Sequence, residues 1–225
     1  MSLSLKSRRD SSSMSLKSRS DTSSLRSRSS KCAEPSSIKC VIVGDAAIGK
    51  TCLSSKFATG KYHSEYNPTT FDNFVVTLPG PSSSYVLSIF DTAGQESFDR
   101  LRVLSYVGCK VFIVCFSVVS PKSFKSVEAN WIEEINHYMP RTPFILVGTR
   151  SDLRRAVRQR GAAVVSKEQG FQLADRIGAE CYVECSALSG EGLRDVFVNA
   201  MEVALKSTSD ISDEDSTCGC RCSIV

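Results

Sequence analysis

The chain has 225 residues, of which 41% are apolar, so it can bury one substantial core and still carry tails. No apolar run approaches the roughly 18 residues of a membrane span, and the N-terminus lacks the apolar block of a secretory signal. We therefore expect a protein with a cytosolic pool rather than an integral membrane or secreted protein. The net charge of +4 is unevenly distributed, because residues 1–31 carry eight Lys or Arg against two Asp.

Residues 1–37 form a serine-rich arm that is nearly free of aromatic and β-branched residues. Such a composition cannot bury enough surface to offset chain entropy, so we predict a disordered basic arm. A short basic serine unit recurs within it at residues 4–8, 15–19 and 24–28. The repeat is interpreted either as an address or kinase target, or as a merely solubilising segment.

From Ile38 onward, apolar runs typical of strands alternate with helical patterns, which predicts an α/β domain over residues 38–205. The expected strands are 38–43, 74–78, 85–90, 111–117, 144–148 and 181–184, and the expected helices are 49–58, 121–138, 167–177 and 191–204. Pro79, Gly80 and Pro81 separate two of the strands and predict one antiparallel hairpin. The prediction is a mostly parallel six-stranded sheet with helices on both faces and ligand-binding loops at one edge.

A phosphate-binding loop is predicted directly after the first strand, where the sequence reads Gly44-Asp45-Ala46-Ala47-Ile48-Gly49-Lys50-Thr51. Glycines let the backbone N–H groups and the following helix N-terminus face an anion. Lys50 is expected to reach the β- and γ-phosphates of a nucleoside triphosphate, and Thr51 to hold Mg²⁺. The alternative interpretation is a glycine turn between a strand and a helix.

A second candidate segment, Asp91-Thr92-Ala93-Gly94-Gln95-Glu96, follows the strand that ends at Phe90. Asp91 emerges at the strand end, where it can approach Mg²⁺. Gly94 is expected to present a backbone N–H to the γ-phosphate, and Gln95 to orient the attacking water. Together with Lys50, these residues predict phosphoryl transfer to water.

The ten cysteines do not predict a disulfide framework or a metal site. Six of them sit within or beside apolar runs and are interpreted as buried reduced thiols: Cys40, Cys52, Cys109, Cys115, Cys181 and Cys185. His63 and His137 are far apart in the sequence, have no cysteine nearby, and are expected at the surface. A zinc site is therefore not predicted.

Four stretches resemble the small GTPases of the Ras superfamily, and specifically the Rho family. They read Tyr66-Asn67-Pro68-Thr69-Thr70-Phe71-Asp72-Asn73-Phe74, residues 91–101, Val118-Val119-Ser120-Pro121-Lys122-Ser123-Phe124 and Glu184-Cys185-Ser186-Ala187-Leu188. The similarity spans residues 38–205. It implies a monomeric GTP/GDP switch with Mg²⁺ and no nucleic-acid partner.

By this resemblance, Thr69 closes on Mg²⁺ and senses the γ-phosphate, while Tyr66 and Tyr62 flank the phosphates and guanine. The two loops that carry Thr69 and Gly94 would be held by the γ-phosphate and released by hydrolysis. The resemblance also implies that effector proteins read a surface formed by Phe71, Asp72 and Phe74, and that exchange factors and activating proteins act on the switch. The alternative for Phe74 is packing at the sheet edge.

Thr149-Arg150-Ser151-Asp152 resembles the base-recognition motif of the family, in which the carboxylate, here Asp152, accepts hydrogen bonds from guanine. Ser186 and Ala187 would complete the guanine pocket, with the Ala187 backbone N–H at guanine O6. The full set expected to contact nucleotide is Gly44, Asp45, Ala46, Ala47, Ile48, Gly49, Lys50, Thr51, Cys52, Tyr62, Tyr66, Thr69, Asp91, Gly94, Thr149, Arg150, Asp152, Ser186, Ala187 and Leu188.

The chain departs from the family pattern at three places. Ala46 stands where glycine is typical, and its methyl group would point toward the space needed by Gln95 and by an arginine finger, which contributes a factor of about 10³ to 10⁵ to the rate. Local accommodation with normal hydrolysis is the alternative. Arg150 replaces the usual lysine. The segment between Asp152 and Gly170 is also shorter than in typical Rho proteins, in which it contains an inserted helical segment.

The tail of residues 206–225 is expected to be flexible and lipidated. Cys222-Ser223-Ile224-Val225 fits a prenylation box. One lipid anchors weakly and residues 209–215 are acidic rather than basic, so Cys218 and Cys220 are expected palmitoylation sites. These features predict the cytoplasmic face of the plasma membrane or endomembranes.

The sequence thus predicts a membrane-anchored Rho-like GTPase in cytoskeletal or polarity signalling. A constitutively GTP-loaded binding protein is the main alternative. A P-loop kinase or ATPase is a third, which Asp152 and Ala187 disfavour.

Overall fold

The computed structural model describes residues 36–62, 69–79 and 84–214. Strands in this part of the chain form one six-stranded sheet in the order β2-β3-β1-β4-β5-β6. The strands are β1 (Ser36–Val43), β2 (Phe71–Pro79), β3 (Ser84–Thr92), β4 (Val111–Ser117), β5 (Phe144–Thr149) and β6 (Tyr182–Glu184). Only the β2–β3 pair is antiparallel, so the predicted fold class is confirmed.

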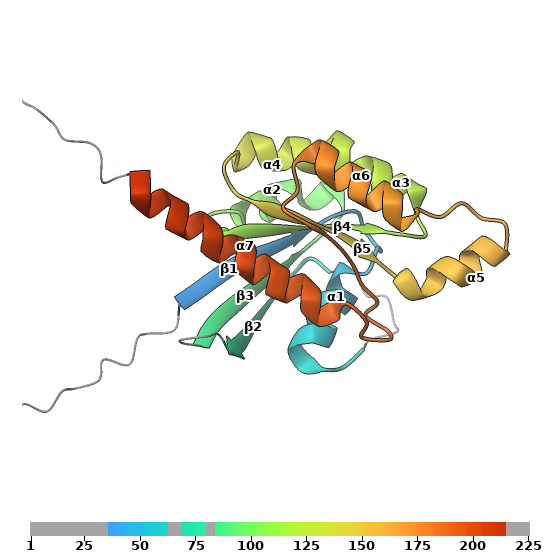
Figure 1. Cartoon of the computed structure of the whole chain (residues 1–225), viewed down its shortest axis with the longest axis horizontal. Coiled ribbons are helices and arrows are strands. Elements are labelled where there is room, and N and C mark those ends of the chain that lie inside the picture. The colour runs from blue at the N-terminus through green and yellow to red at the C-terminus, as the bar shows by residue number, and fades with distance from the viewer. Residues whose placement is uncertain (1–35, 63–68, 80–83, 215–225) are drawn as a thin grey trace, which may run out of the picture. The chain divides into compact units, whose positions relative to one another are not determined.

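The helices surround this sheet (Figure 1). They are α1 (Lys50–Thr59), α2 (Asp99–Leu104), α3 (Pro121–Ser126), α4 (Glu133–Tyr138), α5 (Arg154–Gln159), α6 (Lys167–Ile177) and α7 (Leu193–Glu214), with 3-10 turns η1 (Glu96–Phe98) and η3 (Ser151–Leu153) and a π-helical segment η2 (Val127–Ile132).

The predicted helix at 167–177 agrees with α6, because its ends carry strong local signals. Ser166 and Gln169 form a capping box at the start, and Gly178 adopts a left-handed conformation at the end. The predicted helix at 121–138 is continuous but contains η2, and α7 runs ten residues past its predicted end at 204.

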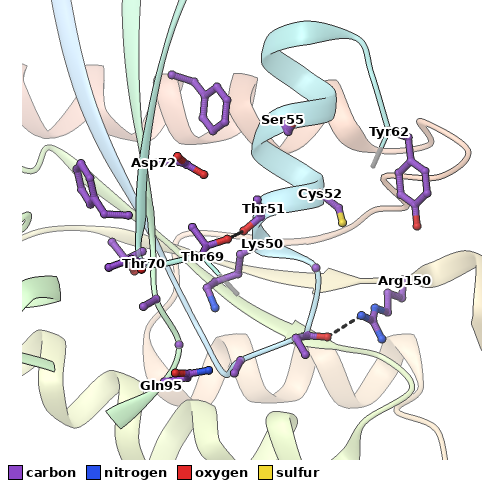
Figure 2. Close-up of a pocket in the computed structure, with 18 of the residues that line it drawn as sticks. Lys50, Thr51, Cys52, Ser55, Tyr62, Thr69, Thr70, Asp72, Gln95 and Arg150 are labelled. Atoms are coloured by element: carbon purple, nitrogen blue, oxygen red, sulfur yellow. Dashed lines mark hydrogen bonds between the residues drawn. The ribbon is translucent and has the colours of Figure 1, made fainter. Parts of the chain in front are cut away.

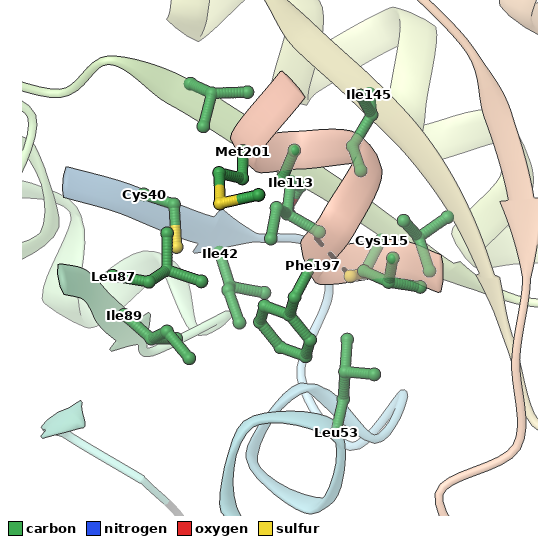
Figure 3. Packing of buried hydrophobic residues seen from close by; sticks show 14 of the residues in the cluster. Cys40, Ile42, Leu53, Leu87, Ile89, Ile113, Cys115, Ile145, Phe197 and Met201 are labelled. Atoms are coloured by element: carbon green, nitrogen blue, oxygen red, sulfur yellow. Dashed lines mark hydrogen bonds between the residues drawn. The ribbon is translucent and has the colours of Figure 1, made fainter. Parts of the chain in front are cut away.

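The strand β4 and residues 40–43 of β1 are buried on both faces, which explains why they read as continuous apolar runs rather than alternating ones. One face of the sheet contributes Cys40 and Ile42 to a core shared with Leu53 of α1 and Phe197 of α7 (Figure 3). The other face packs against α2 to α4 and α6. This second core comprises Val41, Val43, Phe112, Val114, Leu146, Tyr106, Val127, Trp131, Ile135 and Leu173, among others.

The described cysteines form no disulfide. Cys40, Cys109, Cys115 and Cys185 are buried as predicted, but Cys52 and Cys181 are half-exposed, so burial was wrong for these two. Burial raises the pKa of the Cys109 and Cys185 thiols to about 12. His137 is exposed, whereas His63 lies outside the described residues. None of the described helices is long and apolar enough to cross a membrane.

Candidate functional site

A cavity of about 890 Å³ opens at the carboxyl edge of the parallel strands, where a ligand is expected in an open α/β sheet (Figure 2). It is bordered by the loop before α1, the start of α1, the beginning of β2 and the loop after β3. Among its lining residues are Ala46, Ala47, Gly49, Lys50, Thr51, Cys52, Tyr62, Thr69, Phe71, Asp72, Phe74, Gly94, Gln95 and Arg150. The sequence motifs at residues 44–51 and 91–96 therefore meet at one site.

The loop at 44–49 holds a conformation that explains its glycines. Gly44 and Gly49 have φ of 141° and 103°, and a Cβ on Gly44 would lie 2.3 Å from the Cys115 carbonyl oxygen. Ala47 also has a positive φ, 59°. The loop delivers the chain into the first turn of α1, whose unpaired N–H groups and dipole favour an anion.

Lys50 is buried at the bottom of this loop. Its Nζ donates to the carbonyl oxygens of Gly44 at 2.6 Å and Asp45 at 2.8 Å. Burial lowers the pKa of Lys50, while the negative charge of Asp91 opposes that shift. The ammonium group is thus held where a phosphate over the loop can reach it.

Three oxygen-bearing side chains fit a small, hard cation. The hydroxyl oxygens of Thr51 and Thr69 lie 2.6 Å apart, although the residues belong to α1 and to the segment before β2. Asp91 is fully buried, and neither of its carboxylate oxygens has a hydrogen-bond partner in the described part of the chain. Burial raises the pKa of Asp91 to about 6, against the opposing effects of the Thr51 hydroxyl and the Lys50 charge. Two hydroxyls beside an unsatisfied carboxylate suit Mg²⁺, which prefers oxygen ligands.

Gly94 packs directly against the phosphate-binding loop. A Cβ on Gly94 would lie 2.4 Å from the Gly44 carbonyl oxygen and 2.5 Å from the Ala46 nitrogen. Gln95 follows Gly94, is exposed, and lines the same cavity as Ala46 (Figure 2). Ala46, where the family typically has glycine, therefore lies beside the segment that carries Gln95, the residue predicted to orient water.

A smaller cavity of about 150 Å³ shares Tyr62, Cys52 and Arg150 with the first one. Asp152, Ala187 and Leu188, which belong to the predicted guanine pocket, line this smaller cavity. The two loops that carry them are joined, because the Ser151 N–H donates to the Cys185 carbonyl oxygen at 3.1 Å. Arg150 donates through Nη2 to the Ala47 carbonyl oxygen at 2.6 Å, so it links this pocket to the phosphate-binding loop.

Thr149 and Ser186 use their hydroxyls within the protein instead. The Thr149 hydroxyl donates to the carbonyl oxygens of Ile48 at 2.6 Å and Phe116 at 3.0 Å. The Ser186 oxygen accepts the Ser189 N–H at 3.1 Å. Their side chains support the loops, and Ile48 is buried in the core. Tyr66, Cys218, Cys220 and Cys222 lie outside the described residues.

The predicted partner surface is partly exposed. Phe71 and Asp72 are exposed on β2, an edge strand of the sheet, and the Phe71 ring contacts Phe90 edge to face at 5.7 Å. Phe74 is half-buried and packs against the core shared with α1. Both predicted roles of Phe74, packing and surface, are thus compatible with its position.

Two side-chain networks beside the site were not predicted from the sequence. Arg154 forms two hydrogen bonds with the Glu184 carboxylate, joining the segment after Asp152 to β6. Trp131 donates from Nε1 to an Asp45 carboxylate oxygen at 2.8 Å and lies under the Arg102 guanidinium. The partners are 30 and 86 residues apart, so only the tertiary fold brings them together.

A phosphate-binding loop between β1 and α1, an acidic residue at the end of β3 and a base-sized pocket beside Arg150 define a P-loop nucleotide-binding domain. A family model described as the Ras family matches residues 39–206. The chain therefore belongs to the Ras family and is a small GTPase. Proteins of this family bind GTP and GDP and generally interact with effectors, exchange factors and activating proteins.

Proposed function

We propose that the chain is a Rho-like GTP/GDP switch that recruits effectors while GTP is bound. The contact between the Thr51 and Thr69 hydroxyls carries this proposal, because it joins the phosphate-binding helix to the segment leading into β2. Contacts to a γ-phosphate would hold Thr69 and Gly94 in place, and hydrolysis would release them. The proposed partner surface, Phe71 and Asp72, begins two residues after Thr69 and would follow its movement.

In the proposed reaction, GTP is hydrolysed by direct transfer of the γ-phosphoryl group to water. Lys50 would stabilise charge on the β- and γ-phosphates, the Gly94 N–H would bind a γ-phosphate oxygen, and Gln95 would orient the water. Thr51, Thr69 and Asp91 are the residues that would hold Mg²⁺, which neutralises phosphate charge when bound. Asp152 and the Ala187 N–H would select guanine.

A second function, a hydrolysis-impaired protein that stays loaded with GTP, is favoured by Ala46. Gly94 has no free space against the loop at 44–46, and Ala46 and Gln95 line one cavity. Because Gly94 and the loop are packed this closely, the methyl group that Ala46 adds to the cavity wall is expected to hinder the stimulated transition state more than ground-state GTP binding. The chain would then be controlled by abundance or modification.

The Rho-like assignment rests on the motif resemblance at 66–74, 91–101, 118–124 and 184–188. It places the proposed role in cytoskeletal or cell-polarity signalling. Prenylation of Cys222, with palmitoylation of Cys218 and Cys220, would hold the protein at the cytoplasmic face of a membrane. The acidic residues at 209–215 make a purely electrostatic second signal at this end unfavourable.

The proposal is tested by the nucleotide content of the purified protein and by single-turnover GTP hydrolysis with and without an activating protein. We expect bound GDP or GTP, slow hydrolysis, and an increase of several-fold or more in the stimulated rate for Ala46→Gly. Equal stimulated rates for the wild type and Ala46→Gly would reject the impaired function and leave an ordinary switch. Bound adenine nucleotide would contradict both functions.

A further inference from the structure

We propose that Trp131 is a positioning residue that pins the phosphate-binding loop through Asp45, so that the loop cannot yield to the Ala46 methyl group. The inference rests on the proposed GTPase function and explains why accommodation of Ala46 would fail. It assigns a role in the hydrolysis site to a side chain on the helical layer beneath it.

Trp131 contacts the phosphate-binding loop through a hydrogen bond to Asp45. Trp131 is 5% exposed and belongs to η2, the π-helical segment between α3 and α4. Its Nε1–H donates to Asp45 Oδ1 at 2.8 Å. A hydrogen bond to a carboxylate is among the stronger ones in proteins, and π-helical segments frequently occur at functional sites. Asp45 immediately precedes Ala46.

Trp131 is itself held in place by Arg102. The Arg102 guanidinium lies 4.8 Å from the centre of the Trp131 ring, and Arg102 is 4% exposed. Arg102 donates from Nε and Nη2 to the two carboxylate oxygens of Glu134 at 2.9 and 2.6 Å, and Glu134 also accepts from Tyr106. The ring therefore has a fixed cation on one face and cannot turn away from Asp45 without disturbing a buried ion pair.

Arg102, which packs on Trp131, also bonds the second loop of the site. Arg102 Nη1 donates to the Ala93 carbonyl oxygen at 3.1 Å, directly before Gly94. The Trp131 bond fixes the residue before Ala46, while the Arg102 bond fixes the residue before Gly94. Gly94 packs so closely against the backbone of residues 44–46 that even a Cβ would not fit between them. The loop at 44–46 and the segment at 93–95 therefore cannot slide past each other to make room for the Ala46 methyl group. Trp131 and Arg102 thereby set the separation between Ala46 and Gln95.

The test is a cycle of four proteins: wild type, Ala46→Gly, Trp131→Phe and the double variant. Phenylalanine keeps an aromatic ring but removes the N–H donor. Activator-stimulated single-turnover hydrolysis should rise about threefold or more for Trp131→Phe when Ala46 is present, a coupling expected of residues in one network. With glycine at position 46, Trp131→Phe should leave the stimulated hydrolysis rate unchanged or lower it. In that background there is no methyl group to accommodate, so the substitution only removes the preorganisation of the phosphate-binding loop.

Two further variants separate positioning from stability. Ile135→Val trims another buried residue of the same core and should lower the thermal midpoint without changing the hydrolysis rate. Asp45→Ala removes the acceptor without opening the core, and its effect should be non-additive with that of Trp131→Phe. If Trp131→Phe does not fold, the Asp45→Ala and Ala46→Gly cycle decides the question.

The outcomes also separate this inference from the proposed function. A higher stimulated hydrolysis rate for Ala46→Gly, with effects of Trp131→Phe and Ala46→Gly that are strictly additive, would overturn the positioning role of Trp131. The proposed impaired hydrolysis would then still stand. No gain for Ala46→Gly, with Asp45→Ala and Trp131→Phe still non-additive, would reject both impaired hydrolysis and the effect of the pin on the Ala46 methyl group, and would retain only the positioning of Asp45 by Trp131. The same loss for Trp131→Phe in both backgrounds would make Trp131 a structural residue only.

Discussion

Lys50 is held in place in the site, since its ammonium is buried against two carbonyl oxygens of the loop. We predict that Lys50→Ala lowers GDP and GTP affinity by about 10- to 100-fold, as expected for losing a charged hydrogen bond. Equilibrium binding of a fluorescent nucleotide measures this. Lys56→Ala is the matched control, because Lys56 lies on the same helix and its Nζ donates to the exposed carbonyl oxygen of Gly60, the residue that caps the helix C-terminus. Equal affinity in both variants would contradict the phosphate role.

Asp152 carries the prediction of base selectivity. Its side chain is exposed and lines the small cavity with Ala187, which leaves it available to a bound base. Asp152→Ala should weaken GTP binding about tenfold or more while leaving any residual ATP binding unchanged, since only guanine presents matching donors. Competition between the two nucleotides provides the measurement, with Asp175→Ala on α6 as an exposed control. Parallel losses for GTP and ATP would refute the assignment.

At the residue scale, sequence reasoning located the phosphate-binding loop because its signal is local: glycines, a lysine and a hydroxyl at fixed spacing. The partners of side chains could not be predicted in the same way. The Thr149 hydroxyl bonds Ile48, 101 residues earlier, and the Trp131 indole bonds Asp45, 86 residues earlier. Such pairs depend on how strands and helices are stacked, which no local spacing encodes.

Arg154 at the start of α5 and Glu184 at the end of β6 form an ion pair beside the site. Arg154 contacts both carboxylate oxygens of Glu184, and the Tyr182 hydroxyl donates to the same carboxylate at 2.7 Å. Burial alone would raise the pKa of Glu184, but hydrogen bonds from Arg154 and Tyr182 outweigh it, so the pKa lies below its usual value. The folded protein therefore favours the ionised form.

The lowered pKa of Glu184 makes the stability of the folded protein depend on pH. A carboxyl whose pKa is lower when folded stabilises the protein above its unfolded pKa, about 4.3, and that contribution is lost as the pH falls. Glu184→Gln should therefore reduce the free energy of unfolding by about 1–3 kcal/mol at pH 7, and by less toward pH 4 and below. Denaturant unfolding across this range tests it. Glu128→Gln, which breaks the exposed ion pair with Arg176, should change stability by less than about 0.5 kcal/mol.

At the element scale, the sheet and the long helices could be predicted, whereas α2 and α5 were missed. Buried strands are recognised in the sequence by continuous apolar runs, and α6 is recognised by its capping box. By contrast, α5 has no buried residue, and α2 buries Arg102 while Leu101 and Leu104 remain exposed. Apolar periodicity is a weak signal for short helices that place few apolar side chains against the core, and of the apolar residues of α2 only Val103 packs there.

On the scale of the whole molecule, charge is separated along the sequence. The arm at 1–31 carries an excess of six positive charges, whereas the full chain carries four, so the remainder is slightly acidic. The helix α7 continues to Glu214, past the end of the family match at 206 and into the acidic stretch. If the C-terminal cysteines are lipidated as proposed, the basic segment near the other end of the sequence would give a second, separate membrane signal.

The arm, which lies outside the described residues, is therefore predicted to add electrostatic attraction to an anionic membrane. Each basic residue near the surface contributes about 1 kcal/mol, and each phosphate on a serine adds about −1.5 to −2 charges, so a few phosphorylations would cancel the excess. Deleting residues 1–31, or replacing their serines by aspartate, should weaken binding to anionic vesicles, most strongly at low salt. Replacing the same serines by alanine is the charge-neutral control. GTP hydrolysis should be the same in all four proteins, and identical vesicle binding by all of them would rule out the membrane role.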